Sequence, residues 1–372
     1  MQLGLIVKVS KLCNLRCAYC CETTELGDRA RISVDNIRLI FGRVREFLQR
    51  ADLSGETHEV TFYWHGGEPF AQPIAYWRAI LEEQRAEFVG TEKSILILNA
   101  VQSNLTLIRA EHLPLLEHFR LGFSFDVFNS LRVDAGGKAT DGKVRNAISW
   151  LSEAGVPLAG IVVVTPANLN SADEVAYFFI DRGMSFRFIH LDEGLEHLPQ
   201  VRAIRVPFEE YLEFAGRMYA DPRVRKALAA GLRIDPISLT LTKLELQKSG
   251  YRSGLSQEDC AQREHLLEIN TDGQVFSVAD YPYRNSYGSI FTDSIESLLT
   301  SPGRAARIAR SRERLATVCR GCLLYRSGCN GTFVSHATED QYAEYLTNKG
   351  CEVGAVARMI ESNVSPHPTA GR

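Results

Sequence analysis

The stretch Gly4-Leu-Ile-Val-Lys-Val-Ser-Lys-Leu-Cys13-Asn-Leu-Arg-Cys17-Ala-Tyr-Cys20 joins an apolar β-strand pattern to three closely spaced cysteines. The strand pattern ends near Val9, so the thiols lie on a loop at the carboxyl end of that strand. A loop this short can bind three irons of a cubane cluster and leave the fourth iron open to an exogenous ligand. The alternatives are a zinc site or a chance cluster of buried thiols, although a structural zinc site uses four ligands in paired spacing.

Short β-rich runs alternate with helical patterns between residues 4 and 190. This order predicts a parallel sheet covered by helices, and several runs are as continuously apolar as strands buried on both faces. Ser33 can cap a helix, and Gly155 and Gly183 follow two later helices as stop signals. The six predicted strands are Gly4–Val9, Glu59–Tyr63, Ser94–Asn99, Arg120–Phe125, Leu158–Val164 and Ser185–His190.

The composition is that of a globular chain. Its 372 residues are 45% hydrophobic and 23% charged, with a formal net charge of −3. This balance gives no reason to expect nucleic acid or an anionic membrane as a partner, and no apolar run reaches the roughly 18 residues of a membrane span. The start of the chain lacks a secretory cleavage pattern, so we expect a cytoplasmic protein. In such a protein, nine cysteines favour metal binding over disulfides.

A second motif, Trp64-His-Gly66-Gly67-Glu68-Pro69, follows the second predicted strand. Alone, a Gly-Gly-Glu-Pro segment could be an ordinary turn. Placed one βα unit after the three-cysteine loop, it resembles the GGEP segment of the radical S-adenosylmethionine (SAM) superfamily, whose CxxxCxxC loop matches the first motif residue by residue. The resemblance covers residues 1 to about 190. It implies an α/β fold, a partial (β/α)6 TIM-like barrel, and a [4Fe–4S] cluster that binds SAM.

The resemblance also implies roles for the side chains of both motifs. Cys13, Cys17 and Cys20 would ligate the cluster, and one electron from it would cleave SAM to methionine and a 5′-deoxyadenosyl radical. Glycines let the backbone approach a ligand closely, and Glu68 with neighbouring carbonyls would receive the SAM ammonium group. Tyr19 would pack on the adenine, with a plain core position as the alternative.

Further SAM contacts are expected at the ends of the middle strands, where ordinary loop or surface roles are equally compatible with the sequence. Asp126 and Arg132 resemble the family's pattern after the fourth strand and would shape the substrate side. Cys21, which adjoins the last ligand, is expected to be a buried thiol. The predicted SAM-binding residues are Tyr19, Gly66, Gly67, Glu68, Asn104, Ser124 and Arg145.

Four cysteines toward the C-terminus form a second set, Cys319-Arg-Gly-Cys322, Cys329 and Cys351. A CxxC unit can hold one metal site from a single tight turn, and four ligands suit a closed cluster. The region resembles the SPASM extension of radical SAM enzymes, named for its subtilosin, pyrroloquinoline quinone, anaerobic sulfatase and mycofactocin maturases. In that extension seven cysteines hold two auxiliary clusters. The four cysteines fit the set for the outer auxiliary cluster, with one extra residue between Cys322 and Cys329.

The set for the other auxiliary cluster is incomplete. Cys260 fits its start, but the next two cysteine positions fall on Val278 and Phe333. We therefore predict one auxiliary [4Fe–4S] cluster, which would carry away an electron or help to hold the substrate. The alternatives are a second cluster with incomplete protein ligation and, for the four-thiol set, a zinc ribbon, since zinc sites of four cysteines use similar pairs.

Three regions follow from these patterns. Residues 1–200 are predicted to form the radical SAM partial barrel, and residues 201–255 a mostly helical connection. Residues 256–372, where short strands, turns and clustered cysteines begin, are predicted to form the SPASM-like auxiliary-cluster domain.

SPASM enzymes mostly modify peptides or protein side chains, so the resemblance implies a ribosomally made precursor peptide as substrate. We expect hydrogen abstraction from a side chain and an oxidative modification, a C–C (cyclophane-type) or C–heteroatom cross-link. The alternatives are a sulfatase-maturase-like or amino-sugar dehydrogenase-like enzyme, and a non-catalytic iron–sulfur or zinc-binding protein.

The expected reaction also needs a base, a reductant and a means of recognising the substrate. Asp280 lies near the position of a catalytic aspartate in sulfatase-maturing relatives, with a solvated loop role as the alternative. Flavodoxin or ferredoxin is the expected type of electron donor. Twelve residues precede Cys13, so leader recognition is expected from the core, from a separate leader-binding protein, or not at all.

Overall fold

The structure of the protein is a computed structural model. It describes residues 2–20, 22–23, 25–50, 58–91, 94–128, 131–191, 199–251, 264–277, 285–327, 329 and 351–364.

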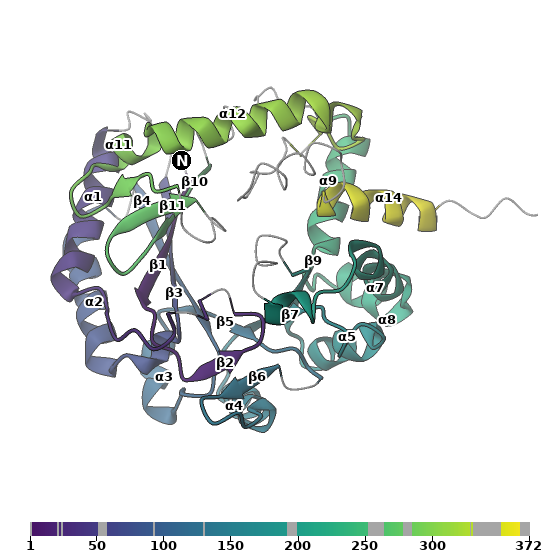
Figure 1. Cartoon of the computed structure of the whole chain (residues 1–372), viewed down its shortest axis with the longest axis horizontal. Coiled ribbons are helices and arrows are strands. Elements are labelled where there is room, and N and C mark those ends of the chain that lie inside the picture. Colours follow the sequence, from purple (N-terminus) through teal and green to yellow (C-terminus); the bar gives the residue numbers. More distant parts are fainter. Residues whose placement is uncertain are drawn as a thin grey trace, which may run out of the picture.

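Six parallel strands form the centre of the fold, and they lie in the order of the sequence. Each coincides with one of the six predicted strands to within a few residues, so the prediction of a parallel α/β sheet is confirmed. Figure 1 shows the strands inside and the helices outside, as in a barrel that is not closed. The strands are β1 (Gln2–Ser10), β3 (His58–Gly66), β4 (Ile95–Ser103), β5 (Arg120–Ser124), β7 (Leu158–Val163) and β8 (Ser185–Ile189).

The helices cover the outer face because their apolar stripes meet the outward side chains of the strands. In α1 (Val34–Arg50), the backbone N–H of Asn36 donates to the Ser33 hydroxyl at 3.1 Å, which is the predicted cap. Phe41 from this helix packs edge-on against the Phe62 and Trp64 rings of β3. The other covering helices are α2 (Ile74–Phe88), α3 (Leu113–Leu116), α4 (Asp141–Glu153) and α5 (Ala172–Ile180).

The sheet extends beyond the six strands at both edges. Next to β8 lies β9 (Ile234–Asp235), and next to β1 lies β10 (Glu264–Ile269), which pairs with β1 in parallel. Strands β11 (Gln274–Ser277) and β12 (Gly288–Ser289) continue this edge in antiparallel order. One sheet of 10 strands therefore runs across the boundary that we predicted between residues 255 and 256. The division into three regions stays a prediction.

The C-terminal helices connect the two sides of the open barrel (Figure 1). Helix α11 (Ile295–Leu299) contacts α1, and α12 (Pro302–Thr317) leads from there to the single turn η4 (Cys319–Gly321). Helix α14 (Glu352–Val364) then packs on the opposite side, against α7 (Phe208–Ala220) and α9 (Ile237–Lys248). Two shorter helices, α6 (Pro199–Arg202) and α8 (Pro222–Ala229), complete the predicted helical region. Among the described residues, no helix is long and apolar enough to cross a membrane.

Candidate functional site

The three-cysteine loop leaves β1 at the carboxyl edge of the sheet. Its middle forms a short strand, β2 (Leu15–Cys17), which pairs with β6 (Arg132–Asp134) from the segment after β5. The Cys13 N–H donates to the Leu26 carbonyl at 3.2 Å, and the Cys20 N–H donates to the Cys17 carbonyl at 3.1 Å. All three cysteines are partly exposed. The backbone of the loop is thus fixed from several sides.

Burial disfavours thiolates in this loop when no cation is bound. It raises the pKa of the Cys13 thiol to about 11 and raises the pKa of the Cys17 thiol as well. Arg132, a buried guanidinium paired in register with Cys17, acts in the opposite direction on both thiols. A positively charged group bound to these sulfurs would reverse the effect of burial, as a metal centre does.

The two glycines of the second motif permit a close contact between β3 and the start of the cysteine loop. A Cβ atom on Gly66 would lie 2.1 Å from the Ser10 carbonyl oxygen, and one on Gly67 would lie 2.3 Å from the Leu12 carbonyl oxygen. The Gly67 N–H donates to the Ser10 carbonyl at 2.8 Å, and the Glu68 N–H donates to the Leu12 carbonyl at 2.9 Å. The structure therefore brings the two motifs together through their backbones, at a spacing that only glycine allows.

The side chain of Glu68 is buried and bonded within the protein. Its carboxylate accepts hydrogen bonds from the backbone N–H groups of Phe70 at 3.0 Å and Asn104 at 2.7 Å, and from the Ser103 hydroxyl at 2.9 Å. Burial raises the pKa of Glu68, and these donors act against that rise. The described contacts tie the end of β3 to the end of β4, and the role of Glu68 toward SAM stays a prediction.

Asn104 and Tyr19 both lie at the cysteine loop. The Asn104 side-chain amide donates to the Asn14 side chain at 3.0 Å and lies 3.9 Å from the Cys13 sulfur. The Tyr19 hydroxyl donates to the Asp126 carboxylate at 2.6 Å and accepts from Arg132 at 3.0 Å. These bonds join the loop to the ends of β4 and β5. Whether Tyr19 also stacks on an adenine stays a prediction.

Ser124 and Arg145 lie beyond the cysteine loop. The Ser124 hydroxyl, at the end of β5, accepts from the Gln102 amide at 2.9 Å. The Arg145 guanidinium lies 5.0 Å from the ring centres of both Phe125 and Phe178 and donates to the Val127 carbonyl at 2.5 Å. These contacts attach Arg145 to the segment after β5 rather than to the cysteines, and its predicted role stays untested.

A buried polar cluster next to the loop was not anticipated from the sequence. Val7 and Val9 pack in the helix-facing core, so the strand alternation turns Lys8 toward the inner face. The Lys8 ammonium group, 1% exposed, forms ion pairs with Glu22, just after the cysteine loop, and with Glu268 of β10 at 2.7 Å. A lysine within an apolar strand was the available signal, but its partners come from distant segments.

His65 is a second residue that sequence reasoning missed. It pairs in register with Lys8 across β1 and β3, directly before the two glycines. Its Nδ1 atom is buried and has no hydrogen-bond partner within the described part of the chain. Burial, and next the charge of Lys8, lowers the pKa of His65 to about 4, so the imidazole is neutral near pH 7. This position offers a neutral polar atom close to both motifs.

Two of the C-terminal cysteines, Cys322 and Cys351, come close to each other across a gap in the sequence. The Cys322 N–H donates to the Cys319 carbonyl at 3.0 Å, and Cys329 closes the next turn by accepting from the Arg326 N–H at 3.0 Å. A Cβ atom on Gly354 would lie 3.4 Å from the Cys351 sulfur and 3.6 Å from the Cys322 sulfur. The four cysteines are partly exposed. Asp280, Cys260 and Cys21 lie outside the described residues, so the predictions for them are not addressed.

Both cysteine sets fit the iron–sulfur groups expected there. Three partly exposed thiols on one fixed loop would leave one corner of a cubane open, and four on a turn and a helix start could close another. In the ranges that the structure describes, no three histidine, cysteine or acidic side chains converge on a point that could hold a single metal ion. Cluster thiolates each bind a different iron and are therefore further apart than ligands that share one zinc.

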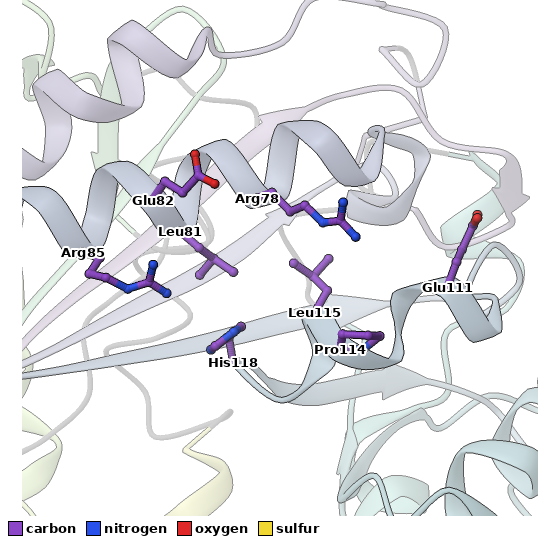
Figure 2. A pocket seen from close by; sticks show the side chains of 8 residues that line it. All are labelled: Arg78, Leu81, Glu82, Arg85, Glu111, Pro114, Leu115 and His118. Atoms are coloured by element: carbon purple, nitrogen blue, oxygen red, sulfur yellow. The ribbon is translucent and has the colours of Figure 1, made fainter.

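A groove on the outer surface is separate from this site. It has a volume of about 230 Å³ and lies between α2 and the segment around α3, where Arg78, Arg85 and His118 line it (Figure 2). A neighbouring groove that shares Arg85 and His118 reaches Asn99, which bonds to Trp64 and to α2 on the helix side of the sheet. These grooves therefore belong to the outside of the barrel.

The comparisons with known proteins agree with the fold and the loop. Residues 7–179 match the model of the radical SAM superfamily. A cysteine-type anaerobic sulfatase-maturating enzyme of Clostridium perfringens is 27% identical over 203 residues, which are 53% of this chain and 53% of that enzyme. The antilisterial bacteriocin subtilosin biosynthesis protein AlbA of Bacillus subtilis is 24% identical over 309 residues, 81% of this chain and 60% of AlbA.

A solved structure shows the same fold over almost the whole length. Native anSMEcpe with bound AdoMet and Cp18Cys peptide has a TM-score of 0.69 and 21% identity, covering 98% of this chain and 100% of that chain. The alignment with the first curated relatives, in contrast, spans about half of their length. The chain thus has the fold of a partial α/β barrel with a three-cysteine loop after its first strand. Residues 7–179, which contain this loop, resemble the radical SAM superfamily, whose members use a [4Fe–4S] cluster and SAM.

Proposed function

We propose that the chain is a radical SAM enzyme that oxidatively modifies a peptide or protein side chain. The observation that carries the proposal is the junction of the two motifs. Gly67 and Glu68 donate backbone hydrogen bonds to Ser10 and Leu12, at the entry to the three-cysteine loop. A loop that is anchored in this way presents its sulfur atoms next to the ends of β1, β3 and β4, where ligands bind in parallel α/β folds.

In this proposal, the residues of the radical SAM domain hold the cofactors. Cys13, Cys17 and Cys20 would ligate a [4Fe–4S] cluster, and the predicted SAM-binding residues would contact SAM. With SAM, such a cluster would supply a 5′-deoxyadenosyl radical able to abstract hydrogen from unactivated carbon. Arg132 lies buried beside Cys17 and offsets negative charge on the thiolates. Glu68 and Asn104 hold the adjoining ends of β3 and β4 in place.

Cys319, Cys322, Cys329 and Cys351 would hold one auxiliary [4Fe–4S] cluster. Support comes from their partial exposure and from the approach of the Cys322 and Cys351 sulfurs to Gly354. Such a cluster can accept the electron that an oxidative modification releases.

The proposed substrate is a precursor peptide, and the proposed product is a C–C or C–heteroatom cross-link. AlbA is a bacteriocin biosynthesis protein, and anSMEcpe is seen with a bound peptide, so relatives of this fold act in peptide chemistry. Asp280 remains the proposed base, and flavodoxin or ferredoxin the proposed type of reductant. Recognition of a leader segment by a separate protein also remains a proposal.

Oxidation of a sulfatase serine or cysteine is the second candidate. It is favoured by the names of the sulfatase-maturating relatives and by the full-length structural match to anSMEcpe. The two candidates predict different products. A cross-linked peptide loses two hydrogens and carries no new carbonyl, whereas an oxidised serine or cysteine side chain gains an aldehyde that reacts with a hydrazide.

Reductive SAM cleavage tests the proposed activity directly. Anaerobically reconstituted and reduced protein is expected to release 5′-deoxyadenosine, as measured by liquid chromatography. Cys17→Ala is expected to abolish this release, because it removes one of the three cysteine ligands that would hold the cluster in the loop. Cys21→Ala is the matched control, since it removes a neighbouring thiol outside the motif. Intact, iron-loaded protein that releases no 5′-deoxyadenosine would refute the proposed activity.

A further inference from the structure

Tyr211 is a fully buried side chain of α7 that contacts the start of α14. Its hydroxyl group donates a hydrogen bond to the carboxylate of Glu352, and the Phe188 carbonyl of β8 lies 3.4 Å away. Burial, and next the charge of Glu352, raises the pKa of Tyr211 well above its ordinary value. The hydroxyl therefore stays protonated and acts as the donor.

Glu352 directly follows Cys351 and opens the first turn of α14. In this turn the Ala355 N–H donates to the Cys351 carbonyl at 2.9 Å. Gly354, one residue before Ala355, faces both the Cys351 and the Cys322 sulfurs, as its Cβ distances of 3.4 and 3.6 Å show. A rotation or a shift of this turn would thus change the distance between two of the four thiols.

The other described contacts of α14 with the barrel are mainly apolar. Val353, Val356, Ala357 and Ile360 are buried in the core that this helix shares with α7 and α9. Apolar packing holds a helix against its neighbours but tolerates small rotations and shifts, whereas a hydrogen bond to a carboxylate in a buried place is directional. The bond from Tyr211 therefore constrains the first turn of α14, which adjoins Cys351.

We infer that Tyr211 is a positioning residue for the auxiliary cluster, because its bond to Glu352 fixes the helix start that carries Cys351. This inference rests on the proposed ligand role of the four C-terminal cysteines. It assigns to a residue of the helical region, far from those cysteines in sequence, a role in the stability of the second cluster. The first cluster, on the loop after β1, is not expected to depend on it.

Tyr211→Phe tests the inference, because it removes the hydroxyl group and keeps the ring among its aromatic neighbours. The reconstituted wild-type protein is expected to hold about eight irons per chain in two four-iron clusters. In the variant, a chelator is expected to remove the iron of the second cluster, half of the total, roughly tenfold faster than in the wild type. This factor corresponds to the loss of a hydrogen bond to a charged group. The electron paramagnetic resonance signal of the SAM-binding cluster, and its change on adding SAM, should persist.

Tyr177→Phe is the matched control. The Tyr177 hydroxyl also donates to a carboxylate, that of Asp221, at 2.5 Å, but it joins α5 to the start of α8 instead of touching α14. Iron release from this variant should equal that of the wild type. Glu352→Gln keeps an oxygen that can accept from Tyr211, so it should release iron more slowly than Glu352→Ala.

The outcomes separate the inference from the proposed function. A wild-type protein with only four irons, or a Cys351→Ser variant with an unchanged second cluster, would refute the proposed ligand set. A wild-type protein with two clusters, together with unchanged iron release in Tyr211→Phe, would overturn the inference alone. Should Tyr211→Phe fail to fold, Glu352→Ala gives the same decision, because it removes the acceptor from a partly exposed helix start.

Discussion

His65 shows how burial sets the charge of a side chain beside the two motifs. Its pKa falls from 6.5 to about 4, so the folded protein keeps the imidazole neutral where the unfolded chain would already be protonated. Between these two pKa values the unfolded state binds more protons than the folded state. The free energy of unfolding should therefore decrease as the pH falls from about 7 to about 4.

His65→Gln is expected to remove part of this pH dependence, by about 1–3 kcal/mol over that range, because glutamine does not titrate. Urea unfolding of the apoprotein at several pH values measures the effect. His118→Gln, a substitution of an exposed histidine, should leave the wild-type slope unchanged. Equal slopes for the wild type and His65→Gln would show that His65 titrates normally in the folded protein.

Gly67 lies directly against the backbone at the entry to the cysteine loop. A methyl group there would meet carbonyl oxygens of Lys11 and Leu12 at 2.4 and 2.3 Å, and backbone atoms cannot move aside as a flexible side chain can. Gly67→Ala is thus expected to displace the entry to the cysteine loop and to lower the iron content of the first cluster by at least half, in the reconstituted protein. Gly142→Ala, in α4, meets nothing within 4 Å and should retain the iron. Full iron loading and normal SAM cleavage in Gly67→Ala would contradict this account.

At the scale of elements, Lys8 holds three segments together. Its ion pairs join β1 to Glu22 after the cysteine loop and to Glu268 of β10. The groups are almost fully buried, so water cannot replace a lost partner. The strand and the loop after Cys20 are therefore coupled by charge as well as by backbone hydrogen bonds.

Lys8→Met is expected to destabilise the apoprotein by about 3–5 kcal/mol, because it leaves two buried carboxylates without their cation. Lys11→Met provides the control: its partner Glu25 is 42% exposed, and loss of such a pair costs about 1 kcal/mol or less. Denaturant midpoints of the two variants and the wild type give the comparison. A smaller loss in Lys8→Met than in Lys11→Met would show that the buried cluster contributes no net stability.

At the scale of the whole molecule, the C-terminal region completes the sheet. Strand β10 covers the edge of β1 over six paired residues, from Gln2 with Glu264 to Val7 with Ile269. The open barrel of residues 1–200 would otherwise expose that edge of β1. Exposed strand edges tend to pair with strands of other chains.

A chain that ends at residue 251 is therefore expected to be poorly soluble or aggregated, although it contains all six predicted barrel strands. A chain that ends at residue 364 retains every described element and is the control. Size-exclusion chromatography and far-ultraviolet circular dichroism distinguish the two results. A soluble, folded chain ending at 251 would show that the barrel is an independent domain.

The local sequence alone determined the six strands, the Ser33 cap and both cysteine motifs. Each of these features depends on residues that lie close together in the chain: the apolar periodicity of a strand, the cap signal of a helix or the spacing of the ligands. Only the tertiary structure decided which distant groups meet: the pairing of β10 with β1, the partners of Lys8 and Glu68, the β2–β6 ladder, and the bond between Tyr211 and Glu352. Such contacts join segments up to 262 residues apart, as in the pairing of Gln2 with Glu264. Their choice depends on how the whole core packs and which buried charges find a partner, and neither quantity can be read from a window of sequence.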